Sequence, residues 1–351
     1  MSMNEHATRA LPPWMEAGGP LQDVILSSRA RLARNVSGLH FPDRMTQADQ
    51  AALIEQVGSA VAKMGGSWGY FPVSEVAPVD LQVLMEKHLV SPQFLQGELQ
   101  RALAIRQDEA AALMVNEEDH VRIQAFSPGL DVEPALATAL EVDDGLENEL
   151  DWAVDSRRGY LTACPTNLGT GLRISVMAHL PGLVLSESIG HLLQALAQAG
   201  VAVRGIYGEG TSALGELFQI SNQVTLGEDE QALAEGVRKV AEQVVEQERQ
   251  ARKRLAAEQM PRIQDRVWRA KGILENARLL SADEAIAQIS ALRLGVEMGL
   301  LKSPSYATLS ALQVVSLPGF LDRTAAQDLS REGRLQLRAS LIRERLTRED
   351  G

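Results

Sequence analysis

The chain of 351 residues contains a single cysteine, Cys164, and aromatic residues make up only 4% of it. One cysteine excludes an internal disulfide framework and any Cys-x-x-Cys metal site. No run of about 18 apolar residues is present, and the first stretch, MSMNEHATRALPPW, lacks the apolar core of a signal peptide. The sequence therefore predicts a protein of the reducing cytoplasm that neither spans a membrane nor is exported by that route.

Three common phosphate- and metal-binding signatures are also missing. The chain has no G-x-x-x-x-G-K-[ST], no complete G-x-G-x-x-G and no H-E-x-x-H. If it handles nucleotide phosphates, it must do so without a P-loop. Lysine is scarce too, at six positions among 34 basic residues, so arginine carries nearly all of the positive charge. Arginine makes planar, bidentate contacts with phosphate and carboxylate that lysine cannot, although a GC-rich coding bias would explain the same skew.

The overall composition is that of an acidic globular protein. The 46 acidic residues exceed the 34 basic ones, which gives a net charge of -12, and 45% of the residues are hydrophobic. This balance does not favour a nucleic-acid binder, so we expect no direct nucleic-acid partner. The length is sufficient for two domains.

The patterning of the chain changes near residue 228. Up to about residue 226, short alternating runs broken by Gly, Pro and Asn predict strands. These are expected at 23–28, on both sides of the acidic turn within 112–126, in GYLTACP, in LRISVMAHL and in VAVRG. A helix is predicted at 186–200, ending at Gly200.

Beyond residue 228 nearly everything is predicted to be helical. A long helix should run from Glu228 to about Glu258, where Pro261 is expected to end it. Further helices are predicted at 262–280, 282–300, 305–315 and 324–348, the second of them opened by a capping box of Ser281 and Glu284.

Five arginines lie at strand ends or within alternating strands. They are Arg29 and Arg31 in SSRARLARN, Arg122 after NEEDH, Arg173 in LRISV and Arg204 before GIYGEG. Because alternate residues of a strand share a face, each can lie on the polar face of a sheet whose other face is core. Five convergent guanidinium groups would hold a triphosphate and offset the charge of phosphoryl transfer, whereas any one alone is more often a solvated strand residue.

Carboxylates gather in two loops. NEEDH contains Glu117, Glu118 and Asp119, and GIYGEG contains Glu209. An acidic turn is usually a solvated hairpin tip, but two carboxylates can also accept hydrogen bonds from separate edges of a guanidinium. Since the pKa of a guanidinium exceeds about 12, making its nitrogen nucleophilic requires an aligned base.

The lone cysteine follows a predicted strand and precedes the turn Pro165, Thr166 and Asn167. A buried small hydrophobe is the ordinary role of such a cysteine. Beside a bound guanidinium, however, its thiolate would be a further anionic contact, and donors in the turn would lower the thiol pKa. A cysteine-dependent hydrolase is a weaker alternative, because the sequence places none of the six histidines beside Cys164.

At these residues the sequence resembles the ATP:guanidino phosphotransferase family, the phosphagen kinases such as arginine and creatine kinase. SSRARLARN, NEEDHVR, CPTNLGTGLR and RGIYGEG occur in the family's order and spacing. EKHLVSP, the segment GIYGEGTSALGELFQISNQ and the helical end of the chain most resemble the bacterial protein-arginine kinase branch. The resemblance implies an α+β fold: a 1–19 segment, a catalytic domain at 20–254 with an antiparallel sheet flanked by helices, and an all-helical domain at 255–351.

The resemblance also implies a role for each site residue. The ATP-binding set would be Ser27, Ser28, Arg29, Arg31, Arg122, Arg173 and Arg204, with His88 near the base. Glu118 and Glu209 would clamp the substrate guanidinium, either serving as base, while Cys164 contacts its non-reacting nitrogen. Glu117, Asp119 and Asn167 would support the site. Magnesium would be held mainly by the ATP phosphates.

In the helical domain the resemblance implies a phosphoarginine-binding Arg-Asp-x-x-Arg-Ala motif. The aligned segment here is RLQLRA, so Arg334 and Arg338 are retained and Leu335 replaces the aspartate. Leucine cannot accept the guanidinium hydrogen bonds that aspartate would. We therefore expect phosphoarginine binding at this segment to be weakened.

Three functions remain open at this point. The leading hypothesis is a protein-arginine kinase that marks proteins for a Clp-type protease or inactivates a stress repressor, with a zinc-finger activator and a homodimeric assembly implied by the resemblance. Little sequence precedes the first motif, which favours an open site that admits a polypeptide with accessible arginines. The alternatives are a small-molecule guanidino kinase and a non-catalytic adaptor.

Overall fold

The computed structural model describes residues 2–16, 18–205, 213–325 and 329–349. The strands in these ranges are β1 Ile25–Arg34, β2 Trp68–Pro72, β3 Ala102–Arg106, β4 Ala111–Val115, β5 Val121–Pro128, β6 Val154–Asp155, β7 Gly159–Tyr160, β8 Leu172–His179, β9 Val201–Gly205 and β10 Leu217–Asn222. The α-helices are α1 Met3–Thr8, α2 Gln47–Lys63, α3 Pro78–Glu86, α4 Val132–Glu147, α5 Pro181–Leu185, α6 Ile189–Gln198, α7 Glu230–Asn276, α8 Ala282–Glu297, α9 Tyr306–Val315, α10 Pro318–Ala325 and α11 Arg331–Glu349.

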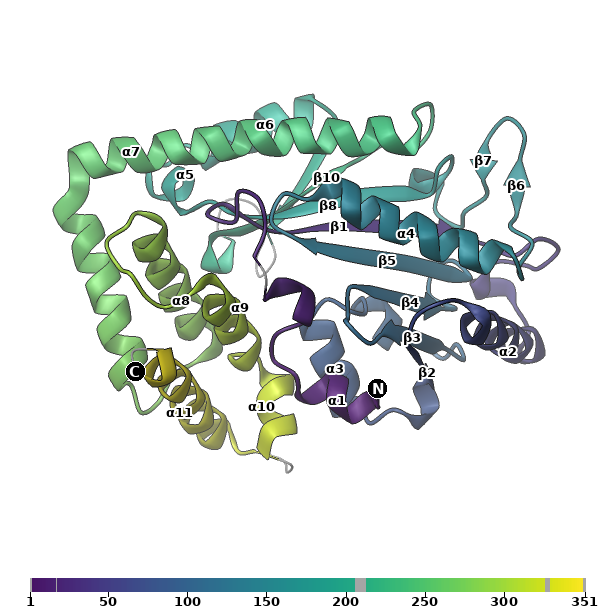
Figure 1. The fold of residues 1–351 in the computed structure, drawn as a ribbon, viewed down its shortest axis with the longest axis horizontal. Helices are drawn as coiled ribbons and strands as arrows, with labels where there is room; N and C mark the ends of the chain where they lie inside the picture. Colours follow the sequence, from purple (N-terminus) through teal and green to yellow (C-terminus); the bar gives the residue numbers. More distant parts are fainter. Residues whose placement is uncertain (1, 17, 206–212, 326–328, 350–351) are drawn as a thin grey trace.

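One eight-stranded sheet forms the centre of the molecule (Figure 1), in the order β2-β3-β4-β5-β1-β8-β10-β9. Every neighbouring pair is antiparallel. The strand that contains SSRARLARN, β1, lies between β5 and β8 and is hydrogen-bonded on both sides. The predicted α+β class, an antiparallel sheet flanked by helices and followed by a helical C-terminal region, is confirmed.

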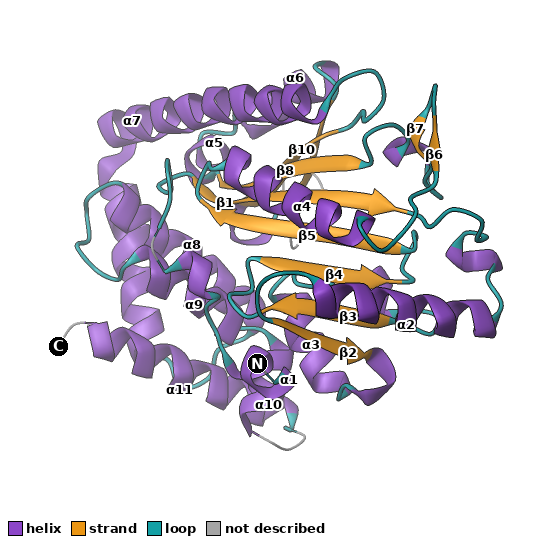
Figure 2. Ribbon diagram, turned by 45° about the vertical axis from the view of Figure 1, so that its right-hand side comes forward, coloured by secondary structure: helices purple, strands orange, loops and turns teal. Residues whose placement is uncertain are grey.

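Helices α2, α4 and α7 cover one face of this sheet (Figure 2). Alternate residues of β1 such as Ala30 and Leu32 enter the core on that side, together with Ile123 of β5 and Ile174 of β8. The period-2 pattern of the sequence produces this arrangement, because successive strand residues point to opposite faces.

The opposite face of the sheet is only partly covered. Helix α3 packs over β3 and β4, where Leu84, Leu103, Met114 and Phe126 belong to a second core cluster. Toward β1 and β8 the same face bears arginines instead of apolar residues. The sheet therefore presents a polar surface beside an apolar one, and that surface carries the candidate site.

The C-terminal helices build a separate core. The end of α7 packs with α8, α9 and α11 around residues such as Val267, Ile289, Leu312 and Ile342. The hydroxyl of Ser281 accepts a hydrogen bond from the Glu284 N–H (3.1 Å), so the predicted N-cap of α8 is present. Helix α7 runs through the predicted boundary between residues 254 and 255, and that boundary stays a prediction.

The predicted break of the long helix before Pro261 is present as a kink. The dihedral angles of α7 leave the helical region at Gln259 (φ -136°, ψ 23°), and a second helical arm then continues to Asn276 instead of residue 280. Figure 1 shows a sharp bend in α7. Proline lacks an N–H but is tolerated in the first turn of a helix, so Pro261 opens a second helical arm just after the kink.

Three other boundaries differ from prediction. The strand expected at 23–28 runs over Ile25–Arg34, because β5 and β8 pair with it along most of its length. The helix expected at 186–200 is observed as α6, which begins three residues later and is preceded by the separate short helix α5; Gly200 follows it in a left-handed conformation (φ 72°). The helix expected at 324–348 is also divided, since α10 ends at Ala325 and α11 begins at Arg331.

A buried ion pair joins the sheet to its covering helix. Arg34 at the end of β1 points to the core face, where its Nη2 lies 2.5 Å from Oδ2 of Asp143 on α4. Its guanidinium also lies over the Tyr160 ring, 3.4 Å from the centroid. Both charged side chains are nearly inaccessible, at 1% and 5% exposure, so each depends on the other.

We expect Asp143→Ala to lower the free energy of unfolding by about 3–5 kcal/mol, because it leaves the Arg34 cation buried without its partner. The control is Glu149→Ala, which removes a surface pair with Lys63 and should cost less than about 1 kcal/mol. Denaturant unfolding measures both variants. An equal decrease in the free energy of unfolding in the two variants would show that the buried pair of Arg34 and Asp143 contributes no more than a surface pair.

Candidate active site

A cavity of about 580 Å³ opens on the arginine-bearing face of the sheet. It is lined by Arg31, Leu32, Ala33, Gln93, Arg101, Glu117, Glu118, Arg122, Cys164, Thr166, Asn167, Gly171, Arg173 and Arg204. Four of the five arginines singled out in the sequence therefore meet there, together with Cys164 and one of the two proposed clamp carboxylates. We call this cavity the arginine cleft.

The floor of the arginine cleft brings several arginines close together. Arg31 of β1 lies directly opposite Arg173 of β8, and Arg29 lies two residues away on the same face. Burial and the neighbouring arginines lower the pKa of Arg31 well below its ordinary value. The same causes lower the pKa of Arg29 to about 10. Among the described residues nothing accepts a hydrogen bond from Arg31 Nε, so this floor is suited to an anion.

The acidic turn between β4 and β5 closes one side of the cleft. Arg122 donates to Glu117 through Nη1 (2.8 Å) and to Glu118 through Nη2 (3.2 Å). Glu117 is buried and also accepts a hydrogen bond from the Ser91 hydroxyl. The Glu118 side chain is 46% exposed, so of the two carboxylates it is the one available to a ligand.

Asp119 lies behind the cleft and does not line it. Its buried Oδ1 accepts hydrogen bonds from Asn35 Nδ2 and from the Ala163 N–H, both at 2.7 Å. Ala163 immediately precedes Cys164, so Asp119 ties the acidic turn to the segment that carries the thiol. The supporting role expected for Asp119 stays a prediction.

The cysteine stands at the start of a short 3₁₀ turn, Pro165–Asn167. Its Sγ lies 3.0 Å from the Thr166 hydroxyl, and its side chain is partly exposed to the cleft. The Thr225 hydroxyl donates to the carbonyls of Thr166 (3.0 Å) and Leu168 (2.7 Å), which fixes the turn. Cys164 is thus not a buried packing residue.

Two of the proposed nucleotide residues line a smaller cavity of about 80 Å³. Ser27 and His88 meet Phe126 and Met177 there, and Trp14 stacks on Phe126 with ring centroids 5.6 Å apart. Burial and the nearby Arg29 lower the pKa of His88 to about 4. An imidazole with this pKa is neutral at pH 7, as a contact to an uncharged base requires.

The structure does not bring every proposed residue to the cleft. Ser28 points to the opposite face of β1, where its hydroxyl donates to Gly129 O (2.8 Å) and accepts from Asp131 N–H (3.1 Å). Arg204 is exposed at the cleft wall near the end of β9. Glu209 lies outside the described residues.

Two protein-family models match this chain. Residues 52–251 match the model of the ATP:guanido phosphotransferase C-terminal catalytic domain, and residues 260–351 match that of the protein-arginine kinase McsB C-terminal domain. The chain belongs to the ATP:guanido phosphotransferase family. Within it the second match assigns the chain to the protein-arginine kinase branch.

Curated relatives extend over the whole chain. A protein-arginine kinase of Halalkalibacterium halodurans is 44% identical over 100% of this chain and 99% of its own length. One of Moorella thermoacetica is 46% identical over 95% and 97%, and one of Bacillus subtilis is 41% identical over 99% and 96%.

Solved structures of the family share the fold. A duplicated taurocyamine kinase from Schistosoma mansoni, with bound transition state analog components, matches 65% of this chain and 34% of its own, with a TM-score of 0.59 and 25% identity. A lombricine kinase matches 69% of this chain and 70% of its own, with a TM-score of 0.56 and 23% identity. The catalytic sheet is therefore the fold of guanidino kinases.

The two arginines expected to bind phosphoarginine both have partners within the chain. Arg334 makes a bidentate ion pair with Asp322 (2.8 and 2.9 Å). Arg338 is buried and donates to the carbonyls of Ser316 (2.6 Å) and Leu280 (2.8 Å). Both arginines join α11 to neighbouring helices, which is a structural use of the retained motif positions.

Sequence reasoning missed Arg101, which also lines the arginine cleft. It immediately precedes β3 and donates to the carbonyls of Asn116 (3.0 Å) and Phe94 (2.8 Å). Arg101 thereby supports the start of the acidic turn. The alternation in RALAIR places it at a strand end, the same criterion that selected the other arginines.

The described residues contain no cluster of three His, Cys, Asp or Glu side chains able to hold a metal ion. No helix in those ranges is both long and apolar enough to cross a membrane.

We expect Arg31→Met to raise the melting temperature of the unliganded protein by about 2–4 °C, which corresponds to about 1 kcal/mol. The substitution removes a buried cation that faces like charges and puts an apolar side chain of similar length in its place. The control, Arg122→Met, deprives two carboxylates of their partner and should lower the melting temperature. A lower melting temperature for Arg31→Met would show that Arg31 has a stabilising partner in the unliganded protein.

Proposed function

We propose that this protein transfers the γ-phosphoryl group of ATP to arginine side chains of proteins. The observation that carries this proposal is the meeting of several arginines, the exposed Glu118 carboxylate and Cys164 in one cleft. Membership in the protein-arginine kinase branch supports the same reaction.

The arginines are proposed to bind the ATP phosphates. Arg31 and Arg173 face each other across the cleft floor. Arg29 lies on the side of the smaller cavity that Ser27 and His88 line, and Arg204 lies at the cleft wall. We therefore propose that the base binds in the smaller cavity and the triphosphate along the arginine row. Fixed guanidinium groups in a partly dry site stabilise the charge that spreads over the transferred phosphoryl group. Magnesium, held mainly by the ATP phosphates, would supply further neutralisation of that charge.

Glu118 is the proposed contact for the acceptor. In the unliganded cleft its Oε2 already binds a guanidinium, that of Arg122, at 3.2 Å. A substrate arginine can take that place and leave Arg122 to the phosphates. As the N–P bond forms and the bond to the β-phosphate oxygen breaks, the guanidinium proton passes to a carboxylate. Glu118 or Glu209 accepts it, and Cys164 orients a non-reacting nitrogen.

The remaining expectations rest on the family resemblance and stay predictions. They are the marking of substrates for a Clp-type protease, the inactivation of a stress repressor, a zinc-finger activator protein, a homodimer and a cytoplasmic location. A small-molecule guanidino kinase and a non-catalytic adaptor are the alternatives that the first experiment separates.

The protein should form phosphoarginine when it is incubated with Mg-ATP and an unfolded arginine-containing protein. Phosphorus NMR detects the acid-labile phosphoramidate, and mass spectrometry locates it. The matched control reaction contains free arginine in place of the protein substrate. Product on free arginine alone would make this a small-molecule kinase, and no ATP turnover in either reaction would favour the adaptor.

Glu118→Gln should reduce kcat about 10²- to 10⁴-fold, the usual contribution of a general base. Cys164→Ala should reduce kcat/KM only about 10- to 100-fold, the equivalent of one charge-assisted hydrogen bond. Glu55→Gln, an exposed carboxylate on α2, is the control and should leave the rate unchanged. Loss of all measurable activity in Cys164→Ala would instead identify the thiol as a nucleophile.

Phosphoarginine should bind weakly to the helical region, since Leu335 replaces the motif aspartate and both motif arginines have partners. Calorimetric titration measures this binding in the intact chain and in the double variant Arg334→Ala, Arg338→Ala. We expect the double variant to bind more weakly still. Tight binding that survives both substitutions would exclude these arginines as the phosphoarginine site.

A further inference from the structure

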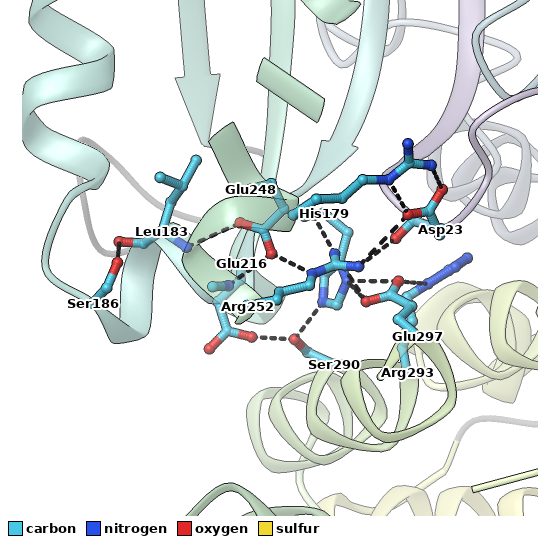
Figure 3. Close-up of polar contacts among 12 residues, drawn as sticks. Asp23, His179, Leu183, Ser186, Glu216, Glu248, Arg252, Ser290, Arg293 and Glu297 are labelled. Carbon is cyan, nitrogen blue, oxygen red and sulfur yellow. Dashed lines mark hydrogen bonds and ion pairs between the residues drawn. The ribbon is translucent and has the colours of Figure 1, made fainter. Parts of the chain in front are cut away.

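A buried polar network lies where the catalytic sheet meets the C-terminal helices (Figure 3). His179 at the end of β8 contacts Ser290 and Glu297 of α8, while Arg252 and Glu248 approach from α7. Glu216, in the short 3₁₀ turn Leu214–Glu216 ahead of β10, accepts a hydrogen bond from Ser290. We call this group the seam network.

The hydrogen bonds of the seam network fix its protons. The Ser290 hydroxyl donates to Glu216, so it must accept from His179 Nε2–H, which lies 2.8 Å away. His179 Nδ1 then faces Glu297 Oε1 at 3.1 Å, and a single proton satisfies that contact. Burial raises the pKa of Glu297 to about 8 and lowers that of His179 to about 3, which puts the proton on Glu297. Whichever group holds it, the pair of His179 and Glu297 is neutral as a whole.

The other ions of the network cancel in pairs, with one exception. The pairs are Arg252 with Glu248 (2.6 Å), Arg249 with Asp23 (2.6 Å) and Arg266 with Glu216 (2.5 Å). The exception is Arg293 of α8, whose carboxylate contact, Glu297 at 3.7 Å, is shared with Arg252 at 3.0 Å. A buried charge that is incompletely paired is strongly disfavoured.

Arg293 is 2% exposed and incompletely hydrogen-bonded. Its Nε lies 3.7 Å from Glu297 Oε1, too far for a hydrogen bond. Within the described ranges neither Nε nor Nη1 has a hydrogen-bond partner. The guanidinium lies over the Tyr306 ring, 5.1 Å from its centroid, which holds the group in place without satisfying its donors.

Arg293 lines a cavity of about 360 Å³ that is distinct from the arginine cleft. One wall comes from the sheet side, including Gly19, Gln22 and Gly129, and the other comes from α8, α9 and the loop between them. That loop adds a second cation, Lys302, and α9 adds Ser310. The exposed Glu16 is the acidic group among the lining residues. No residue that lines this cavity also lines the arginine cleft.

We propose that this cavity is a second anion site, which binds inorganic phosphate or the phosphate group of a small metabolite. The anion would place a counter-charge beside Arg293 and attract Lys302. Because the walls come from the sheet and from the C-terminal helices, occupancy would hold these two parts together. The site goes beyond the proposed kinase reaction, whose phosphates bind in the arginine cleft.

The test is a thermal-unfolding titration of the full chain with inorganic phosphate at constant ionic strength. A saturating magnesium-bound, non-hydrolysable ATP analogue occupies the arginine cleft throughout. The wild-type protein should show a saturable rise in melting temperature. Arg293→Met should weaken the apparent Kd about 10- to 100-fold, and Lys302→Met, at an exposed position, about threefold.

Arg269→Met on α7 is the matched control, because this arginine is 73% exposed and distant in sequence from the cavity walls. It should titrate like the wild type, which separates binding from the general stabilisation by phosphate. Without phosphate, Arg293→Met should be at least as stable as the wild type, since it removes an incompletely paired buried cation. If Arg293→Met does not fold, the phosphate titration of Lys302→Met tests the proposal instead. Identical titrations in the wild type and the cavity variants, or no saturable response in the wild type, would overturn the proposal.

Discussion

The burial of positive charge on one face of the central sheet is the constraint on which the rest of the structure depends. Arg31 and Arg173 lie directly opposite each other on β1 and β8, and burial and the neighbouring arginines lower the pKa of Arg31. The same strand carries Arg34 to the opposite face, where Asp143 neutralises it. Because successive strand residues point to opposite faces, β1 carries Arg34 on the covered face, where it stabilises the fold, and Arg31 on the open face, where a ligand can bind. The apolar packing of α2, α4 and α7 must offset the cost of these buried charges.

Sequence reasoning succeeded where a short local pattern determines the outcome. Period-2 alternation assigned the arginines to strands, and β-pairing then made them neighbours. It failed where tertiary context decides. Ser28 belongs to the same motif as Arg29, yet one step along the strand turns it to the other face. Neither the strand order nor the seam network has a signature in the sequence.

The C-terminal helices are joined to the catalytic sheet through charge as well as apolar contact. Ser290 of α8 and Arg266 of α7 both hold Glu216, which lies shortly after the segment that carries Glu209. The helical region therefore contacts the chain at a residue that lies, in the sequence, shortly after a proposed clamp carboxylate. Arg293 on the same helix faces the second cavity. A ligand in that cavity would contact the same helix, α8, that holds Glu216 through Ser290.

The most direct test of this account is an experimental structure of the protein with a magnesium-bound ATP analogue. The account predicts a triphosphate along the arginine row, with oxygens in hydrogen-bond distance of Arg31 and Arg173 and the base against His88. A nucleotide whose phosphates bind away from these arginines, with Arg31 still unpaired, would contradict the assignment of the arginine cleft as the site of phosphoryl transfer.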